Sequence, residues 1–198
     1  SPPEVMVFER DEAGLWTRIQ TFGRGDRDEG FGAILAAHGD VLVVGTRVMP
    51  WEAGRAYIFE RNGDRQWQET HQILAPEGVN GFGYYVSLDG DQMLIGAPFR
   101  NLPDAEDIGA VFLYQREPDD RWLLSQEIRA GNGQAGDEFS VVALEDGTAV
   151  VGSRRYWRDN NSGAAYRYTI SSGTACTPDG ACVCRDGWQG AECSEELP

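Results

Sequence analysis

The cysteines are the residues whose chemistry is set most clearly by their spacing. All four lie within the last 23 residues, as Cys176, Cys182, Cys184 and Cys193. Zinc modules pair their cysteines as C-x-x-C, and that paired spacing is missing here. An even number of clustered cysteines in a glycine-rich segment indicates disulfide bonds and therefore an oxidising, extracellular compartment. Four cysteines allow three pairings, and the spacing leaves all three open.

Catalytic chemistry has little support in this sequence. The two histidines, His38 and His71, lie in no recognisable motif, and the clustered cysteines leave no free thiol to act as a nucleophile. The sequence contains neither a phosphate-binding loop nor a dinucleotide fingerprint. Carboxylates are numerous, but their spacing singles out no pair. We therefore expect a protein that is not an enzyme and that needs no cofactor.

One tripeptide suggests adhesion. Arg24, Gly25 and Asp26 spell R-G-D, the integrin-recognition motif, in a loop just before an expected strand. The corresponding loops of later units, at 76–81 and 131–138, are also rich in glycine and acidic residues. This similarity favours an ordinary loop of the repeat that happens to contain the tripeptide.

A basic and aromatic cluster stands out in this acidic chain. Arginine and aromatic side chains are enriched at protein interfaces, so the cluster is a candidate contact with a partner protein. With one tryptophan from the corresponding loop of an earlier unit, its members are Trp51, Arg154, Arg155, Tyr156, Trp157 and Arg158. The alternative, an ordinary surface loop, stays open. Asn160 begins an N-glycosylation sequon in the same segment, which matters only in a secreted eukaryotic protein.

The charge of the chain limits its partners. Acidic residues number 32 and basic residues 17, which gives a formal net charge of -15. Such a surface repels nucleic acid and anionic membranes, and we expect no membrane insertion because no apolar run is long enough to span a bilayer. Asp104, Glu106 and Asp107 lie in one polar loop and are candidates for weak calcium binding. A solvated acidic loop is the favoured interpretation.

These candidates are set on a sequence that repeats about three times. The aromatic series Phe8, Phe59, Tyr114 and Tyr168 has gaps of 51, 55 and 54 residues. Eight residues after each of the first three comes a tryptophan, namely Trp16, Trp67 and Trp122. This period is typical of propeller blades, because one such unit cannot bury its apolar face alone. The strict spacing favours tryptophans that pack between blades over tryptophans that bind sugars.

Within the best-formed unit, apolar residues alternate with period two, as in strands. We expect four antiparallel strands there, at 81–88, 92–97, 109–116 and 121–129. Four such strands make one blade. The expected fold class is therefore all-β: a partial β-propeller of about three four-stranded blades over residues 1–170, followed by a small disulfide-rich tail over 171–198.

The middle unit reads F-G-x-x-V-x-L-D-G-D-x-x-L-I-G-A-P, then G-A-V-F-L-Y, then a tryptophan. This pattern resembles the FG-GAP repeat, most closely its bacterial type and more distantly the integrin alpha-subunit propeller. The resemblance covers about residues 5–170 and implies a propeller scaffold. The outer units depart from it, since Gly45-Thr46-Arg47 and Gly152-Ser153-Arg154 replace G-A-P, and Ser140 replaces the second motif glycine.

One departure from the family bears on metals. Integrin-type repeats carry a calcium loop, D-x-D-x-D-G, between the first two strands of a blade. Here the corresponding connections are short turns at 38–40, 89–91 and 145–147. These turns hold too few oxygen ligands for a calcium ion, which takes six to eight. The family's calcium sites cannot be carried over to this chain.

The expected blades do not close a ring. The sequence starts in the third strand of a blade, runs through two intact blades and reaches a last unit whose fourth strand has no counterpart. An open array exposes strand edges and the faces between blades, which favours association. The chain is therefore either a piece of a longer polypeptide or a subunit that is completed by further blades, by other subunits or by its own copies.

The tail resembles the C-terminal half of an EGF-like module. Its run C-V-C-R-D-G-W-Q-G-A-E-C has the frame C-x-C-x8-C, with Gly187-Trp188 and Gly190 inside it. A full module has six cysteines, and the first two are missing. The resemblance implies that Cys184 pairs with Cys193, which leaves Cys176 and Cys182 to pair with each other.

These patterns favour a non-catalytic, secreted structural or adhesion protein that mediates protein–protein contacts in a surface or matrix assembly. One alternative is a carbohydrate-binding module that uses Trp51 or Trp157. Another is an accessory propeller segment of a larger enzyme.

Overall fold

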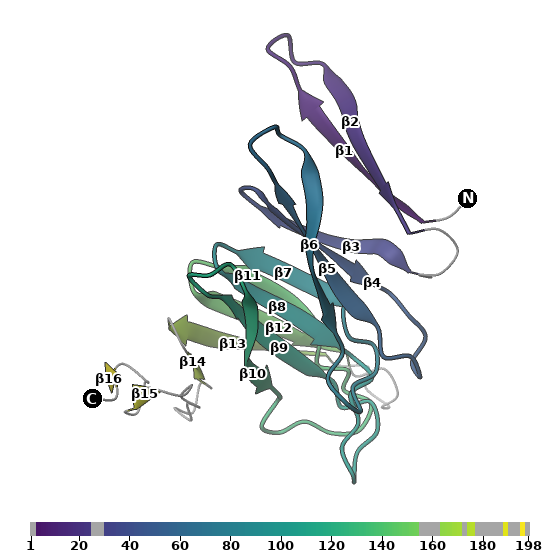
Figure 1. Ribbon diagram of the computed structural model, residues 1–198. Coiled ribbons are helices and arrows are strands. Elements are labelled where there is room, and N and C mark those ends of the chain that lie inside the picture. The colour runs from purple at the N-terminus through teal and green to yellow at the C-terminus, as the bar shows by residue number, and fades with distance from the viewer. Residues whose placement is uncertain are drawn as a thin grey trace.

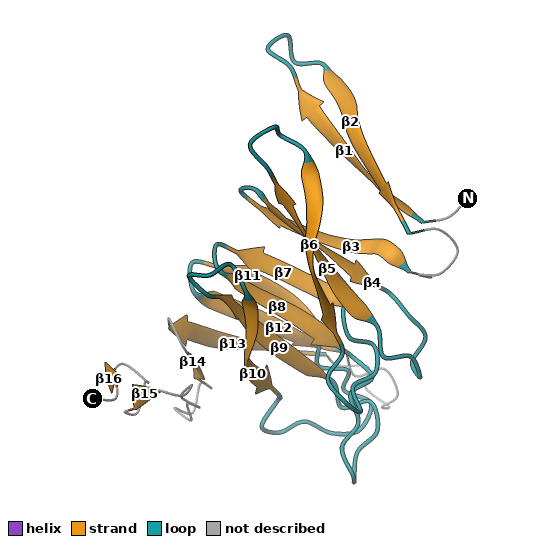
Figure 2. Ribbon diagram, in the orientation of Figure 1, coloured by secondary structure: helices purple, strands orange, loops and turns teal. Residues whose placement is uncertain are grey.

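The computed structural model describes residues 3–24, 30–154 and 163–171, together with short strands at 174–176, 188–189 and 195–196. All regular elements within these residues are β-strands, and none is a helix that could cross a membrane (Figure 2). They form three four-stranded antiparallel sheets and two two-stranded ones (Figure 1). The prediction of an all-β fold with several four-stranded sheets is confirmed, and the arrangement is consistent with a partial propeller.

Strands that are consecutive in the chain are neighbours in each sheet. The N-terminal hairpin contains β1 (Glu4–Arg10) and β2 (Trp16–Gly23). Blade 1 contains β3 (Phe31–His38), β4 (Val41–Thr46), β5 (Arg55–Arg61) and β6 (Trp67–Leu74). Blade 2 contains β7 (Tyr85–Asp89), β8 (Gln92–Ala97), β9 (Ala110–Arg116) and β10 (Trp122–Ile128). Blade 3 contains β11 (Val141–Glu145), β12 (Thr148–Ser153), β13 (Ala164–Ser171) and β14 (Thr174–Cys176), and β15 (Trp188–Gln189) pairs with β16 (Glu195–Glu196).

Two strand predictions differ from the structure. The strand expected at 81–88 begins only at Tyr85, because Gly83 adopts a left-handed backbone with φ 87° and interrupts the extended chain. Blade 3, which had no expected fourth strand, has the three-residue β14 beside β13. Backbone hydrogen bonds along β13 suffice for this pairing, so the tryptophan of the other fourth strands is not required.

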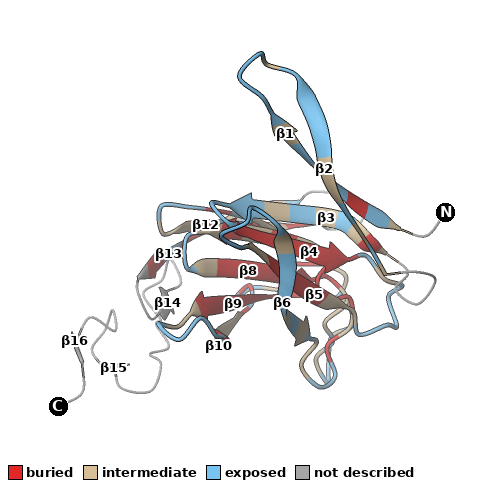
Figure 3. Cartoon of the chain, turned by 45° about the horizontal axis from the view of Figure 1, so that its top comes forward, coloured by how far each residue is buried: buried red, intermediate tan, exposed pale blue. Residues whose placement is uncertain are grey.

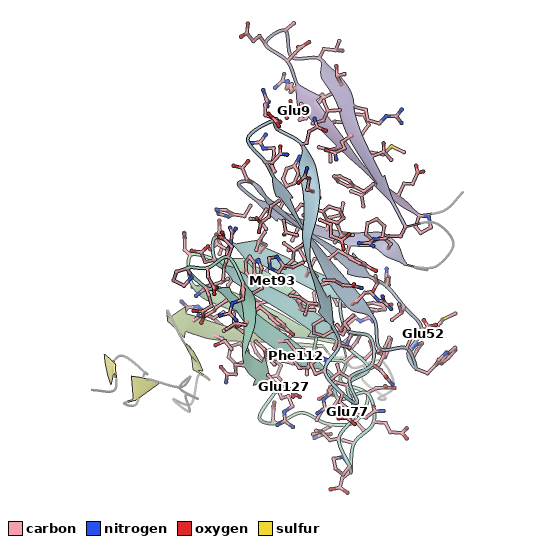
Figure 4. The ribbon with its side chains drawn as sticks, in the orientation of Figure 1. Glu9, Glu52, Glu77, Met93, Phe112 and Glu127 are labelled. Carbon is pink, nitrogen blue, oxygen red and sulfur yellow. The ribbon has the colours of Figure 1, made fainter. Side chains whose placement is uncertain are left out.

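The blades stack face against face through apolar side chains, and the central strands β4, β8 and β9 are the most buried (Figure 3). Blade 1 meets blade 2 through Val43 and Ile58 on one side and Met93 and Phe112 on the other (Figure 4). Each of these four side chains is at most 1% exposed. Burying a side chain of this size contributes about 1.5–3 kcal/mol, so the contact between blades is the main source of stability.

The glycines at two of the three G-A-P positions, Gly45 and Gly96, set how closely neighbouring blades approach. A Cβ atom on Gly96 would collide with the carbonyl oxygen of Ser140 in blade 3, and one on Gly45 would collide with that of Gly83 in blade 2. The backbone of one blade therefore rests directly on the backbone of the next. This close approach is the physical reason that the motif needs glycine there.

Candidate functional site

The loop between β4 and β5, residues 47–54, carries two exposed apolar side chains. Trp51 is 72% exposed, the largest value among the big apolar side chains of the described residues, and Met49 is 55% exposed. Within the loop, the Glu52 amide donates to the Met49 carbonyl and the Met49 amide donates to Glu52 Oε2, each over 2.9 Å. These paired hydrogen bonds hold Met49 and Trp51 in a defined turn.

The same loop is tied to the next blade. The amide of Gly81 donates to the carbonyl of Glu52 over 2.8 Å, and the amide of Phe82 donates to that of Ala53 over 2.9 Å. Glu52 and Glu77 mark the two neighbouring loops in Figure 4. The tryptophan is therefore presented on a loop anchored at both its turn and its base, which reduces the conformational entropy that a partner would have to remove.

Arginine and tyrosine side chains from three blades gather beside this loop. The guanidinium carbon of Arg47 lies 4.5 Å from the ring centroid of Tyr84, within range of a cation–π interaction. The Tyr84 ring also lies 5.2 Å from Tyr85 and 5.5 Å from Phe99. Arg154 is near enough to Tyr84 and Tyr85 for them to affect its pKa. The structure thus brings one predicted contact residue, Arg154, into a shared group with four residues that were not among the predicted contacts.

Arg154 is held in place by a carboxylate. Its Nη2 donates to Glu138 Oε2 over 2.6 Å, and Glu138 is only 7% exposed. Burial acts to lower the pKa of Arg154, but its hydrogen bond to Glu138 and the charges of Tyr85 and Glu138 act against burial and leave the pKa above its ordinary value. Arg154 therefore stays charged, and its guanidinium is tied to the loop that contains Glu138.

Arg24 of the R-G-D tripeptide contacts blade 1. Its guanidinium carbon lies 4.1 Å from the Tyr57 ring centroid, and the same group pairs with Glu69. Gly25 and Asp26 lie outside the described residues. Because an integrin-binding arginine would need a free guanidinium, these contacts are a physical argument for the ordinary-loop interpretation.

Several predicted site residues cannot be placed. Arg155, Tyr156, Trp157, Arg158 and Asn160 lie outside the described residues, as do Cys182, Cys184 and Cys193. Cys176 is described only by its backbone, in β14. The EGF-like tail, its disulfide bonds and the glycosylation site therefore stay predictions.

The acidic loop between β8 and β9 is structured by its own backbone contacts. The amide of Asp107 donates to Asn101 Oδ1 over 2.7 Å, and Asp107 has a φ of 49°. Burial, and then the neighbouring charge of Glu106, raise the pKa of Asp107. Over the residues that the structure describes, no three His, Cys, Asp or Glu side chains are grouped to hold a metal ion, and Asp104, Glu106 and Asp107 form no such group.

The N-terminal hairpin has an exposed apolar face, as expected for an open array of blades, but Trp16 on this face was expected to pack between blades. Trp122 is 7% exposed, in agreement with packing between blades, but Trp16 at the same repeat position is 63% exposed. Phe8 and Met6, on the neighbouring strand, are 48% and 47% exposed. Figure 3 shows most of this hairpin in the colour of exposed residues. The repeat explains this exposure, because it places an apolar face where the described residues include no further blade to cover it.

Stacked four-stranded sheets with a shared repeat define an all-β repeat protein. A protein-family comparison gives this class a name, since the model of the FG-GAP repeat matches residues 67–114 and 122–168. Each matched unit begins with the outer strand of one blade, β6 or β10, and ends in the third strand of the next. The chain therefore contains FG-GAP repeats. No curated protein matches it.

Proposed function

We propose that this chain is a non-catalytic, extracellular protein-contact module, in which FG-GAP repeats hold a binding loop at one end of the blades. The observation that carries the proposal is Trp51 beside Met49 on the anchored 47–54 loop. Tryptophan is enriched among the residues that dominate binding energy at protein interfaces, and methionine adapts to irregular apolar surfaces. FG-GAP repeats are often involved in protein–protein or adhesion contacts, which supports this reading.

The surroundings of Trp51 favour a protein partner over a sugar. A sugar site needs polar groups that hydrogen-bond to hydroxyls beside the stacking ring. Trp51 follows the exposed Met49 and Pro50, which are apolar, and the Met49 amide donates to Oε2 of the adjacent Glu52. Arg47 adds a cation that stacks on Tyr84 and lies at the start of the same loop. An apolar centre beside a charged rim is the usual composition of a protein interface.

The extracellular location rests on the four clustered cysteines, and the assembly role rests on the exposed 47–54 loop. Secretion would oxidise the four cysteines to disulfides. A surface or matrix assembly would use the exposed loop for contact. The alternatives are a carbohydrate-binding module and an accessory segment of a larger enzyme, and the mass of the intact native polypeptide tests the latter.

A retention experiment tests the proposal. The immobilised full chain is exposed to extracellular proteins of its source, and bound proteins are quantified for the wild type, for Met49→Ala/Trp51→Ala, and for Leu74→Ala. Leu74 is 62% exposed on β6, outside the loop, and so controls for general loss of apolar surface. We expect the loop variant to lose at least about tenfold in affinity, as for a central interface tryptophan, and the control to be unchanged.

Two results would count against the proposal. Equal retention by the loop variant and the wild type would show that Trp51 is not the contact residue. Binding of the wild type to a glycan array, lost in Met49→Ala/Trp51→Ala without any retained protein, would establish the carbohydrate-binding alternative.

A further inference from the structure

Two departures from the G-A-P pattern place arginines at equivalent positions of two blades. The third position of the pattern is Arg47 in blade 1, Pro98 in blade 2 and Arg154 in blade 3. The guanidinium carbon of Arg47 lies 4.5 Å from the ring centroid of Tyr84, at the start of blade 2. Arg154 is near enough to Tyr84 and Tyr85 for both to affect its pKa. The two arginines therefore approach one tyrosine pair, from the preceding blade and from the following blade.

The backbone around Arg47 is held by hydrogen bonds. The preceding residue, Thr46, is buried, and its Oγ1 donates to the Arg55 carbonyl over 2.9 Å and accepts from the Arg55 amide over 2.8 Å. These two hydrogen bonds join the residues on either side of the 47–54 loop. The Arg47 amide also donates to the Gly30 carbonyl over 3.1 Å. Arg47 therefore has a fixed backbone in the loop that carries Trp51, so binding there costs little additional backbone entropy.

The charge of Arg47 is not neutralised by a carboxylate of the described residues. Arg47 is exposed, and none of the ion pairs in the described part of the chain involves it, although acidic residues outnumber basic ones by 32 to 17. Arg154, at the equivalent position, donates to Glu138 Oε2 over 2.6 Å. The Tyr84 ring holds the Arg47 guanidinium without neutralising its charge, which leaves N–H donors for an anionic group of a partner.

We propose that the 47–54 loop binds an acidic segment of a partner protein, in which a carboxylate contacts Arg47 and an apolar side chain contacts Met49 and Trp51. The inference rests on the proposed contact function of this loop and adds the chemistry of the partner. A planar guanidinium binds a carboxylate through two parallel hydrogen bonds. One unpaired guanidinium matches the single charge of a carboxylate, whereas a phosphate group has a charge of about −1.5 to −2 near pH 7.

The spacing within the loop limits the length of the partner segment. Arg47 and Trp51 are four residues apart, so their Cα atoms are separated by at most about 14 Å, and an extended segment of about six residues spans both. The net charge of -15 does not prevent this contact, because salt at physiological concentration screens exposed charges beyond about 8 Å. A nearby unpaired cation therefore acts on the segment more strongly than distant carboxylates do.

A random peptide display library tests the proposal with a defined probe. The immobilised full chain selects peptides as the wild type, as Arg47→Gln and as Met49→Ala/Trp51→Ala, with Arg121→Gln as the matched control. Arg121 is an exposed arginine in the turn before β10, and its Nε donates to Asp119 Oδ2 over 2.7 Å. Circular dichroism shows that each variant is folded before selection.

The four selections should differ in a defined way. The wild type and Arg121→Gln should enrich peptides in which an acidic residue lies within about six residues of an aromatic or aliphatic one, relative to the unselected library. Arg47→Gln should keep the apolar preference and lose the acidic one. Met49→Ala/Trp51→Ala should enrich neither, because the apolar contact is removed.

A double-mutant cycle then measures the contact between Arg47 and the carboxylate. One enriched peptide is synthesised with its acidic residue and with the corresponding amide. The amide peptide should bind the wild type about tenfold more weakly, as for a lost hydrogen bond to a charged group. Arg47→Gln should bind both peptides with equal affinity, because the two changes remove the same interaction.

Three results would overturn the proposal. Enriched peptides without an acidic preference, lost in Met49→Ala/Trp51→Ala, would contradict the carboxylate contact and leave the contact function of the loop standing. An acidic preference that persists in Arg47→Gln would place the cation elsewhere. No enriched peptide for the folded wild type would show that the loop does not bind a linear segment. Acidic peptides that need Arg47 but are retained by Met49→Ala/Trp51→Ala would instead support the carboxylate contact and contradict the proposed function of Trp51.

Discussion

Tyr114 illustrates how the stack changes the chemistry of one residue. Its ring lies between blades 1 and 2, 6.3 Å from the Phe82 centroid, and the residue is 6% exposed. Burial disfavours the phenolate and raises the pKa of Tyr114 to about 12 from its ordinary value of 10.0. The sequence contains no lysine, so no ammonium group titrates in the same range.

We expect stability to fall at alkaline pH because of this tyrosine. In the unfolded chain it loses its proton near pH 10, whereas in the folded chain it keeps the proton until about pH 12. The unfolded state therefore binds fewer protons in this range, and the free energy of unfolding falls between pH 10 and 12 by up to about 2 kcal/mol. Urea unfolding at several pH values checks this. Tyr114→Phe should show a shallower decline, and an identical decline would contradict the assignment.

At the scale of the elements, the spacing between blades depends on backbone contacts that only glycine permits. β8 approaches blade 3 so closely at Gly96 that no side chain fits beside the Ser140 carbonyl. Hydrogen bonds reinforce this approach, since the Leu144 amide donates to Ser87 Oγ over 3.0 Å and the Asp146 amide donates to Asp89 Oδ2 over 2.7 Å. The pairing of blades 2 and 3 is thus set by main-chain fit as well as by apolar burial.

Gly96→Ala should destabilise the protein by about 2–3 kcal/mol, because the added methyl group would force blades 2 and 3 apart. Urea unfolding measures this loss. The urea midpoint should fall, and the m-value should not change. Gly131→Ala is a matched control, since a Cβ atom there meets nothing within 4 Å. If both variants lost the same stability, a general effect of replacing glycine, rather than the contact between blades, would be responsible.

At the scale of the whole molecule, the position of a blade in the stack determines how far its equivalent residues are buried. Trp122 packs in the interface between blades 1 and 2, Trp67 is partly buried against the hairpin, and Trp16 is 63% exposed. The amide and carbonyl of Trp67 also exchange hydrogen bonds with the Gln20 side chain, over 2.9 and 2.7 Å. The same residue type at the same repeat position is therefore buried inside the stack, as Trp122, and exposed at its end, as Trp16.

Trp122→Ala should cost about 3–5 kcal/mol in the free energy of unfolding, as for a large side chain removed from a packed interior. Trp16→Ala should cost less than about 1 kcal/mol in the isolated chain, since most of its ring is already in water. Chemical unfolding of the two variants makes the comparison. A large loss for Trp16→Ala would show that the side of the β1–β2 hairpin that contains Trp16 is covered in solution.

The sequence by itself determined the repeat, the all-β class and the FG-GAP pattern. Period-two alternation and turn residues such as Asp89 and Gly90 act over a few residues, so they specify strands and hairpins locally. The recurrence of Phe59 and Tyr114, 55 residues apart, predicted the blade repeat. Arg154 stays a predicted contact residue, and its ion pair with Glu138 was not foreseen, because the two residues are 16 positions apart and meet only when β11 pairs with β12.

Only the tertiary structure decided which equivalent positions are buried, which charges are paired and where the molecule is open. Arg24 reads as part of an adhesion motif in the sequence, yet it stacks on Tyr57 in the fold. Trp16 reads as core, yet it lies on the surface. Burial depends on a neighbouring blade that lies about 50 residues away in the chain, and local alternation is the same whether that neighbour is present or not.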